Sequence, residues 1–328
     1  MKLILVVDGG TTNLRVTAID ASTHEVLANA KAAGGVKHTA VDGNNLRLKQ
    51  LLRECIESVL TQTGCTEEEV LRCIAFGMIT SNMGLLEIPH LIAPVSLQDL
   101  HDGMQTSVFP EIASFPIEFI PGVRNLSGVV NAENCGQMDM MRGEEVEAIG
   151  LYQLAKPSCA SVFVLPGSHN KLIRMSTDGK IMACMTSISG ELLDVISHYT
   201  ILSDAVQHSF CSAENYDAKM TIDGAKACAV TGLGRAAFSG RILNTLGKLP
   251  AASVQSWLLG AVLAEDAKAA EAFTVGEQDS TIYVAGKPPL QQAFCDVLET
   301  LTDMTTISVK PEESAQMGLV GALMIAGC

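Results

Sequence analysis

Two short polar turns in this chain follow hydrophobic runs and have the composition of phosphate-binding loops. Residues 8–13 read Asp-Gly-Gly-Thr-Thr-Asn after the hydrophobic run 3–7, and residues 166–169 read Pro-Gly-Ser-His after the run 161–165. Glycine lets the backbone approach a ligand closely, and successive N–H groups with neighbouring hydroxyls suit phosphate oxygens. The first turn alone is equally consistent with an ordinary hairpin, and His169 alone is better explained as a histidine satisfied within its turn. As a pair, the turns favour a nucleotide bound between two related halves.

Three carboxylates could take part in phosphoryl transfer. Asp8 lies where the first hydrophobic run ends, and a carboxylate there can hold Mg²⁺, usually through water, beside bound phosphates. Glu144 and Glu145 stand at the predicted start of a helix, between the two turns in the sequence. Transfer to a hydroxyl needs a carboxylate that accepts the hydroxyl proton. Acidic residues at a helix N-terminus also complement the helix dipole, so both explanations stay open.

Two arginines are candidates for binding a carboxylate of the substrate. Arg142 directly precedes the Gly143-Glu144-Glu145 segment, and Arg124 lies in the stretch before it. The planar guanidinium group matches both oxygens of a carboxylate in a bidentate pair. For each arginine, the simpler alternative is an ion pair on the protein surface.

Charge and hydrophobicity exclude several classes of protein. The 328 residues include 22 Lys+Arg and 36 Asp+Glu, so the formal net charge is −14. A nucleic-acid-binding protein normally presents a basic surface, and an anionic membrane would also repel this chain. The longest hydrophobic tract, 317–327, has 11 residues, whereas a membrane span needs about 20. We therefore expect a cytoplasmic protein with no nucleic-acid or membrane partner, and the length suggests about two domains.

The ten cysteines do not follow the pattern of a metal site. No two stand at a C-x-x-C spacing, and none lies near a pair of histidines, whereas a zinc cage needs ligands at short, paired spacings. Most cysteines lie in hydrophobic runs, such as Cys73 in 71–76, where a free thiol behaves as a small hydrophobic side chain. This usage is typical of a reducing compartment.

The elements that must position these residues form two similar series. The first is predicted to contain strands at 3–7, 14–19 and 25–31, a helix at 45–63 and a strand at 72–76. The second contains a helix at 144–154 and strands at 161–165, 171–175 and 180–185. Helices follow at 203–211, 217–230, 239–247, 251–272 and 289–301, with strands at 281–285 and 305–309 and a last helix from Pro311. Residues 89–122 lack a period and are predicted to be an excursion between domains or beside the substrate. Because each series opens as strand, polar turn and strand, the chain has a weak internal repeat.

Six motifs, taken in order, resemble those of the 2-dehydro-3-deoxygalactonokinase family. They lie at 8–15, 77–82, 141–145, 166–171, 189–192 and 284–286, so the resemblance extends from residue 3 to about residue 326. The duplicated plan also resembles the wider actin/hexokinase/Hsp70 superfamily. The resemblance implies an α/β, two-domain actin-like ATPase (ribonuclease H-like) fold, with duplicated mixed sheets and helices on both faces. The expected domains are 1–122, with the first phosphate turn, and 123–328, with the second phosphate turn and the adenosine site.

The resemblance implies a kinase that uses ATP and Mg²⁺ to phosphorylate the terminal hydroxyl of 2-dehydro-3-deoxygalactonate, in galactonate catabolism. It places Asp8 at the metal and makes Glu144, with Glu145 behind it, the proton acceptor. It assigns the nucleotide to Gly9, Gly10, Thr11, Thr12, Gly167, Ser168, His169, Gly286 and Lys287. It assigns the sugar acid to Asn13, Arg15, Ser81, Asn82, Arg142 and Lys171.

Other functions remain open at this point. The chain departs from the family pattern at Gly9, at Ser189 and over 133–139, so a kinase of a different sugar acid on the same fold is one alternative. A second is an actin-like or chaperone-like ATPase, which would hydrolyse ATP without a sugar. A catalytically inactive sensor is disfavoured because Asp8 and Glu144 are both present. The expected partner is a small sugar acid, and a homo-oligomer is left open.

Overall fold

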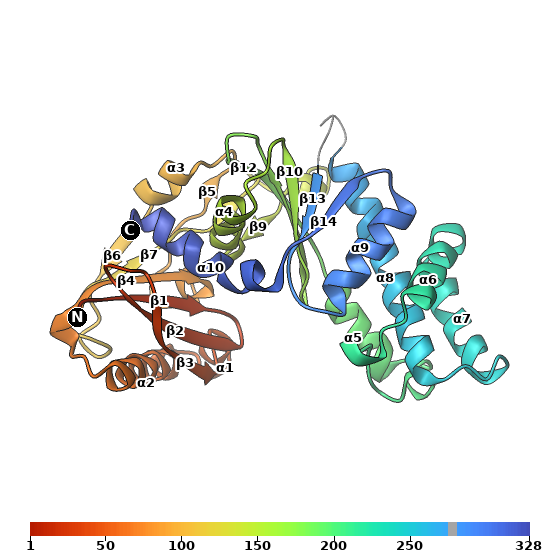
Figure 1. Cartoon of the computed structure of the whole chain (residues 1–328), viewed down its shortest axis with the longest axis horizontal. Coiled ribbons are helices and arrows are strands. Elements are labelled where there is room, and N and C mark those ends of the chain that lie inside the picture. The colour runs from red at the N-terminus through yellow and green to blue at the C-terminus, as the bar shows by residue number, and fades with distance from the viewer. Residues whose placement is uncertain (275–280) are drawn as a thin grey trace. The chain divides into compact units, whose positions relative to one another are not determined.

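The computed structural model describes residues 1–274 and 281–328 (Figure 1). Contacts within the chain divide it into two units: unit 1 is 1–156, 179–183 and 316–328, and unit 2 is 157–178 and 184–315. The domain boundary expected after residue 122 falls inside unit 1. The reason is that strand β8 (Val123–Arg124), which follows it, pairs with β5 (Leu91–Ile92) on one side and β9 (Met140–Met141) on the other.

A six-stranded sheet forms the centre of unit 1. Its strands are β1 (Leu3–Gly9), β2 (Asn13–Asp20), β3 (Val26–Ala33), β4 (Val70–Gly77), β6 (Gln105–Ser107) and β7 (Ile117–Phe119). Their order is β3-β2-β1-β4-β7-β6. The strands β1, β2 and β3 are antiparallel neighbours, whereas β4 runs parallel to β1 and β7 runs parallel to β4. The predicted excursion at 89–122 therefore contributes two strands to the main sheet.

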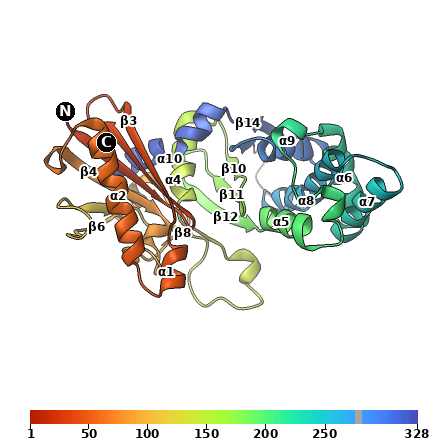
Figure 2. The same cartoon turned by 90° about the horizontal axis from the view of Figure 1, so that it is seen from below.

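Helices cover both faces of this sheet, as the hydrophobic pattern of its strands requires. Five consecutive hydrophobic residues of β1 are buried, which is typical of a central strand. Helix α2 (Leu46–Thr63) packs on one face (Figures 1 and 2), and the left-handed Gly64 ends it. On the other face, Gly318 of α10 (Pro311–Ala326) packs against Phe76 of β4 and against Glu147 of α4 (Glu144–Ala155).

Unit 2 repeats the same topology in its five-stranded sheet. The strands are β10 (Ser161–Leu165), β11 (Asn170–Met175), β12 (Ile181–Ser187), β13 (Thr281–Val284) and β14 (Thr305–Ser308). Their order, β12-β11-β10-β13-β14, corresponds to β3-β2-β1-β4-β7. As in unit 1, the opening strands β10 and β11 are antiparallel. Strand β13 then runs parallel to β10, and β14 runs parallel to β13. The predicted internal repeat is confirmed at the level of strand order.

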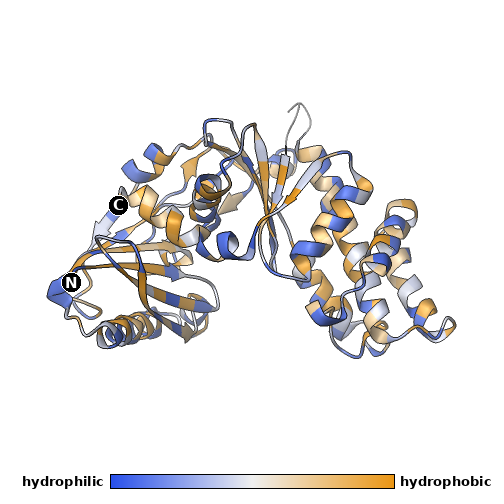
Figure 3. Ribbon diagram, in the orientation of Figure 1, coloured by the Kyte–Doolittle hydropathy of each residue, from blue (hydrophilic) through white to orange (hydrophobic). Residues whose placement is uncertain are grey.

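The helices of unit 2 share one hydrophobic core with its sheet (Figure 3). They are α5 (Ser189–Tyr199), α6 (Ala218–Thr231), α7 (Leu233–Thr245), α8 (Ala251–Phe273) and α9 (Leu290–Leu301). The helix predicted at 203–211 is wrong, because Gln207 and His208 adopt left-handed conformations and only Asp204–Val206 forms a helical turn. The helix predicted at 239–247 begins earlier, at Leu233. The short helix α1 (Lys37–Asp42) and α5 were not predicted.

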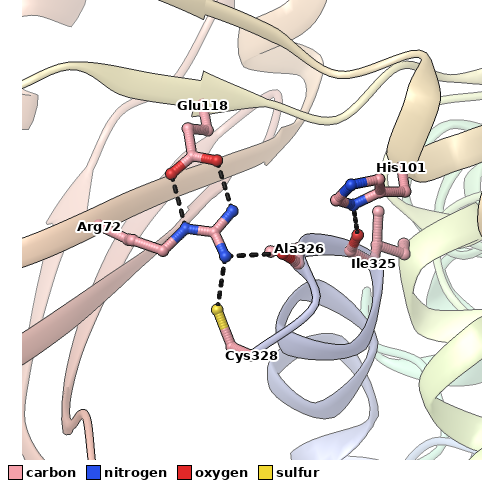
Figure 4. A network of polar contacts seen from close by, with 6 residues as sticks. All are labelled: Arg72, His101, Glu118, Ile325, Ala326 and Cys328. Carbon is pink, nitrogen blue, oxygen red and sulfur yellow. Dashed lines mark hydrogen bonds and ion pairs between the residues drawn. The ribbon is translucent and has the colours of Figure 1, made fainter.

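The last turn of α10 is bound by two side chains, one from the unit 1 sheet and one from α3 (Leu97–Asp102) (Figure 4). Arg72 of β4 makes a bidentate ion pair with Glu118 of β7 and donates hydrogen bonds to the carbonyl oxygen of Ala326, at 2.6 Å, and to Cys328 Sγ, at 2.9 Å. His101 of α3 contacts the carbonyl oxygen of Ile325 through Nδ1 at 2.7 Å. These contacts hold the end of α10 against the unit 1 sheet, on which Gly318 also faces Phe76.

All ten cysteines carry free thiols. Nine of them are buried or half-buried, and Cys135 is exposed, which agrees with their predicted use as small hydrophobic side chains. Within residues 1–274 and 281–328, no helix is both long and hydrophobic enough to cross a membrane.

Candidate active site

The first predicted phosphate turn, between β1 and β2, has a defined backbone. The N–H of Gly10 donates to the carbonyl oxygen of Asn13 at 2.9 Å and closes the turn. The exposed Thr11 and Thr12 have backbone N–H groups with no acceptor in the described part of the chain. The start of α1 supports the turn from behind, since a Cβ on Gly35 would collide with the carbonyl oxygen of Gly10. Two consecutive N–H groups are thus presented to solvent.

The second predicted turn, between β10 and β11, is built in the same way. The N–H of Gly167 donates to Asn170 Oδ1 at 2.9 Å, while the backbone N–H groups of Ser168 and His169 have no acceptor among the described residues. Here the start of α5 gives the support, since a Cβ on Gly190 would collide with the carbonyl oxygen of Gly167. The internal repeat therefore includes more than the strand order. In both units, a glycine near the start of a helix packs against the backbone of the turn.

Asp266 of α8 holds the second turn and α5 together. Its buried carboxylate accepts hydrogen bonds from Asn170 Nδ2 at 2.8 Å and from Ser189 Oγ at 2.9 Å. Burial raises the pKa of Asp266, and hydrogen bonds from Ser187, Asn170 and Ser189 oppose this. The sequence analysis missed this residue, because no local pattern distinguishes Asp266 from the neighbouring acids Glu265 and Glu271 of the same helix.

Three glycines bring the start of α4 to the ends of β1 and β4 in unit 1. Gly9 and Gly77 are register partners at the carboxyl ends of those strands. A Cβ on Gly77 would lie 2.9 Å from the Gly9 carbonyl oxygen, and a Cβ on Gly143 would lie 3.3 Å from Gly77 Cα. Larger side chains at these positions would separate the elements. Asp8 and the acidic start of α4 therefore lie in one neighbourhood.

Asp8 is half-buried at the end of β1. Burial raises the pKa of its carboxyl group, and the nearby positive charge of Arg15 opposes that shift. A buried carboxylate of this kind gains most from a cation, because the cation offsets the cost of burying the negative charge.

Glu144 and Glu145 have different surroundings. Glu144 is half-buried, and its Oε2 accepts a hydrogen bond from the backbone N–H of Arg142 at 3.1 Å. Glu145 is fully buried, and both of its carboxylate oxygens lie 2.8 Å from the N–H of Gly143. Burial and the charge of Glu144 raise the pKa of Glu145 to about 8. Of the two, Glu144 is the side chain that a substrate could reach.

Glu147, one helical turn further along α4, was not predicted. Burial raises its pKa to about 8, with further contributions from the charges of Glu144, Asp8 and Glu145, while Arg15 opposes the shift. Its charge is therefore coupled to the same carboxylates. A helical spacing of three residues from Glu144 was the sequence signal that could have identified it.

The raised pKa values predict that stability decreases as pH rises. The carboxyl groups of Glu145 and Glu147 have an ordinary pKa of 4.5 and a folded-state pKa of about 8. Between these values the folded chain holds more protons than the unfolded chain, so the free energy of unfolding falls with increasing pH. We expect Glu147→Gln to raise Tm at pH 8 by at least about 3 °C and to change it little at pH 4.5.

Thermal melts of the wild type and of Glu147→Gln between pH 4.5 and 8.5 check this expectation. The exposed Glu54 of α2 provides the control, and Glu54→Gln should leave the pH dependence unchanged. A Glu147→Gln curve that stays parallel to the wild-type curve would contradict the assignment.

Arg142 is half-buried and bound to the protein itself. Its Nη1 donates to the carbonyl oxygen of Thr80 at 2.7 Å and to Thr80 Oγ1 at 2.8 Å, and its Nη2 donates to the carbonyl oxygen of Ile88 at 2.5 Å. The guanidinium group therefore holds the segment 78–90 against the start of α4. Its predicted contact with the sugar acid remains a prediction.

Arg124 differs from Arg142 in having an unused donor. Its Nε is buried and has no hydrogen-bond partner among the described residues. His90 lies near both arginines: burial, then the charges of Arg142 and Arg124, lower the pKa of its imidazole to about 4. A Cβ on Gly122 would lie 2.7 Å from Arg142 Cγ and 2.9 Å from His90 Cδ2. Arg124 and Arg142 thus form a positively charged region of the candidate site, beside the neutral imidazole of His90.

The other predicted residues divide between the two units. Asn13 and Arg15 are exposed beside the first turn, Asn82 is exposed, and Ser81 is buried and bonded to the Met78 carbonyl oxygen. In unit 2, His169 Nε2 lies 2.9 Å from Glu191 Oε1, and the buried Lys171 donates to Thr186 Oγ1. A Cβ on Gly286 would lie 3.3 Å from Pro166 Cδ, which places Gly286 beside the second turn, and Lys287 is exposed.

The donor groups fit ATP and Mg²⁺. Two pairs of N–H groups, at 11–12 and 168–169, could bind phosphate oxygens. Mg²⁺ beside phosphates keeps most of its water ligands and needs only one or two protein carboxylates, which Asp8 could supply. The residues that the structure describes contain no group of three or more His, Cys, Asp or Glu side chains that could form a metal cage.

Comparisons with known proteins agree with this geometry. The sequence model of the family described as 2-keto-3-deoxy-galactonokinase matches residues 8–322. A protein of Rhizobium meliloti (strain 1021) named "Probable 2-dehydro-3-deoxygalactonokinase DgoK1" is 28% identical over 201 residues, which cover 61% of this chain. The match spans 58% of that relative's length.

Solved structures share the fold. A Sinorhizobium meliloti structure, titled "Crystal structure of a putative 2-dehydro-3-deoxygalactonokinase protein", aligns over 98% of both chains with a TM-score of 0.77 at 23% identity. The activator of 2-hydroxyisocaproyl-CoA dehydratase from Clostridium difficile aligns over 99% of this chain and 94% of its own, with a TM-score of 0.50 at 11% identity. The predicted actin-like fold is confirmed.

Proposed function

We propose a function from one premise: the chain belongs to the 2-keto-3-deoxy-galactonokinase family. We infer that it transfers the γ-phosphoryl group of ATP to the terminal hydroxyl of 2-dehydro-3-deoxygalactonate, as a cytoplasmic step of galactonate catabolism. The observation that supports this most is local to unit 1. An accessible carboxylate, Glu144, lies in the same neighbourhood as Asp8 and a turn with two unused N–H groups.

Each step of the reaction then has a residue suited to it. The N–H groups of Thr11 and Thr12, and of Ser168 and His169, bind phosphate oxygens. Gly286 and Lys287 contact the adenosine. Asp8 holds Mg²⁺, which when bound neutralises charge on the phosphates.

Proton transfer is assigned to Glu144. Its carboxylate accepts the proton of the sugar hydroxyl as that oxygen attacks the γ-phosphorus atom, and the bond from phosphorus to the β,γ-bridging oxygen breaks. Glu145 stays buried behind it and holds the N–H of Gly143, which fixes the start of α4. The helix start therefore positions Glu144 without Glu145 contacting the substrate.

We assign the carboxylate of the sugar acid to Arg124. Its buried Nε lacks a partner, and a substrate carboxylate would satisfy it. Arg142 contributes its charge nearby while its donors hold the segment 78–90. Asn13, Arg15, Ser81, Asn82 and Lys171 remain candidates for the sugar hydroxyls.

Replacing Arg124 by methionine is expected to raise KM for the sugar acid roughly 10- to 100-fold, because a charge-assisted hydrogen bond contributes about 1.5–3 kcal/mol. KM for ATP should change less than about twofold. Steady-state kinetics with each substrate varied in turn measure both values. Arg53→Met, on the exposed face of α2, is the control. Equal effects of Arg124→Met on both KM values would contradict the assignment.

The proposed activity itself is tested by an ATP-coupled assay with 2-dehydro-3-deoxygalactonate. Turnover well above that of Glu144→Gln supports it. A panel of other sugar acids, compared by kcat/KM, distinguishes a related kinase on the same fold. ATP hydrolysis that proceeds equally without any sugar acid would instead favour a non-metabolic ATPase.

A further inference from the structure

A group of exposed hydrophobic side chains lies on α5 and α7 of unit 2, outside the proposed active site. Tyr199 at the end of α5 is 80% exposed, Ile201 just after it is 62% exposed, and Val195 and Phe238 are also exposed. Such a concentration on a soluble domain is typical of an interaction surface. We call these four residues the α5–α7 patch.

Two residues of the patch, Ile201 and Phe238, line a hydrophobic pocket of about 370 Å³. Both helices line the pocket, together with the segment that follows α5. The lining residues are Leu192, Ile196, Thr200, Ile201, Leu202, Leu233, Gly234, Ala237 and Phe238. Tyr199 follows Val195 by four residues, so the two lie on one face of α5. The exposed ring of Tyr199 thus lies beside the hydrophobic pocket.

A surface with a projection beside a hole is complementary to a second copy of itself. In a two-fold contact the same patch forms both sides of the interface, so the Tyr199 ring of each copy can enter the pocket of the other copy. Aromatic side chains that fill pockets are the usual centres of such interfaces. The shape of the patch therefore favours self-association over binding of an extended peptide.

The charges around the patch also favour a second copy of the chain as the partner. Helix α5 carries Asp194 and no lysine or arginine, whereas α7 carries Arg235 and Arg241 and no acid. The other acid of α5, Glu191, contacts His169 at the second turn and is not part of this rim. Arg241 lies at the pocket, because its Nη1 donates to the carbonyl oxygen of Ile201 at 2.5 Å. Neither arginine has an acidic partner in the part of the chain that the structure describes. A two-fold contact that sets α5 of one copy on α7 of the other pairs these charges twice.

We propose that the α5–α7 patch is the interface of a two-fold homodimer. Hydrophobic residues form its centre, and Asp194 of α5 and the arginines of α7 form its rim. The proposal is independent of the catalytic function proposed above, because none of its residues belongs to the machinery assigned there.

The test uses the full chain in sedimentation velocity and light scattering over about 1–100 μM. A species of twice the monomer mass is expected. Tyr199→Glu should weaken the dimer at least about 30-fold, as loss of a central contact does. Val230→Glu places the same charge on an 85% exposed valine of α6, outside the patch, and should leave the dimer intact.

A charge exchange gives a second, independent readout. Asp194→Arg should weaken the dimer by repulsion from the partner's arginines, and adding Arg241→Glu should restore much of the affinity. Unchanged far-UV circular dichroism and Tm show that the variants fold. The proposal is overturned if the wild type is monomeric at every concentration. It is equally overturned if the dimer survives both Tyr199→Glu and Phe238→Glu, since the contact would then lie elsewhere.

Discussion

Glu144→Gln is expected to lower kcat roughly 10²- to 10⁴-fold, which is the usual contribution of a positioned general base. Glutamine keeps the size of the side chain and still accepts the hydrogen bond from the N–H of Arg142, but it cannot take a proton. KM for ATP and for the sugar acid should change little, because binding does not depend on that proton transfer. Steady-state kinetics at pH 7.5 measure the three constants.

Glu145→Gln is the matched control, one residue away on the same helix. At pH 7 its carboxyl group, with a pKa of about 8, is mostly protonated in the fold. Glutamine is neutral as well and preserves an acceptor for the N–H of Gly143. We therefore expect less than about a tenfold loss of kcat. If Glu145→Gln lost as much activity as Glu144→Gln, the proton acceptor would be the buried residue and the assignment would be reversed.

Asp8→Asn is expected to reduce kcat on the order of 10³-fold at a fixed Mg²⁺ concentration, since it removes the charge that we assign to the cation. An amide is a weaker ligand for Mg²⁺ than a carboxylate, so the concentration of Mg²⁺ that gives half-maximal activity should also increase. Titrations of activity with Mg²⁺ and with Mn²⁺ measure this second effect. A loss that is independent of the cation concentration would argue for a structural role.

Asp20→Asn tests whether the effect is specific to the site. Asp20 lies at the far end of β2 in the same sheet, where its carboxylate accepts hydrogen bonds from Ser22 and Thr23. Its pKa is lowered, mainly by the hydrogen bond from the Ser22 side chain. Asp20→Asn should therefore affect stability slightly and leave the Mg²⁺ dependence unchanged.

Much of the central fold could be predicted because its signals are local. The five hydrophobic residues of β1 and the polar turn after them lie within 11 residues, and the helix spacing in α2 repeats over a long segment. The same applies to β10 and its turn. The sequence singles out Asp8, Glu144 and the two polar turns as candidates because each lies at the end of such an element.

Other features depend on contacts that no local pattern records. The three-residue strands β6 and β7 are too short to show a period. They form because β7 pairs with the edge of β4 and β6 then pairs with β7. The role of Arg142 is set by the carbonyl oxygens of Thr80 and Ile88, which lie 62 and 54 residues away in the sequence. Gly35 is important through the backbone of Gly10, which only the folded chain brings close.

Cys135 has a practical consequence as the single exposed thiol among the ten cysteines. Because burial suppresses the reaction of a thiol with alkylating reagents, brief treatment of the native protein with a maleimide dye should label Cys135 before the half-buried Cys65, Cys159 and Cys328. That label would sit in the 125–139 loop, which starts directly after Arg124 and closes through the N–H of Asn125 on the carbonyl oxygen of Asp139. The wild-type chain therefore carries its own attachment point for a fluorescent reporter of the sugar-acid binding that we propose at Arg124, without engineered cysteines.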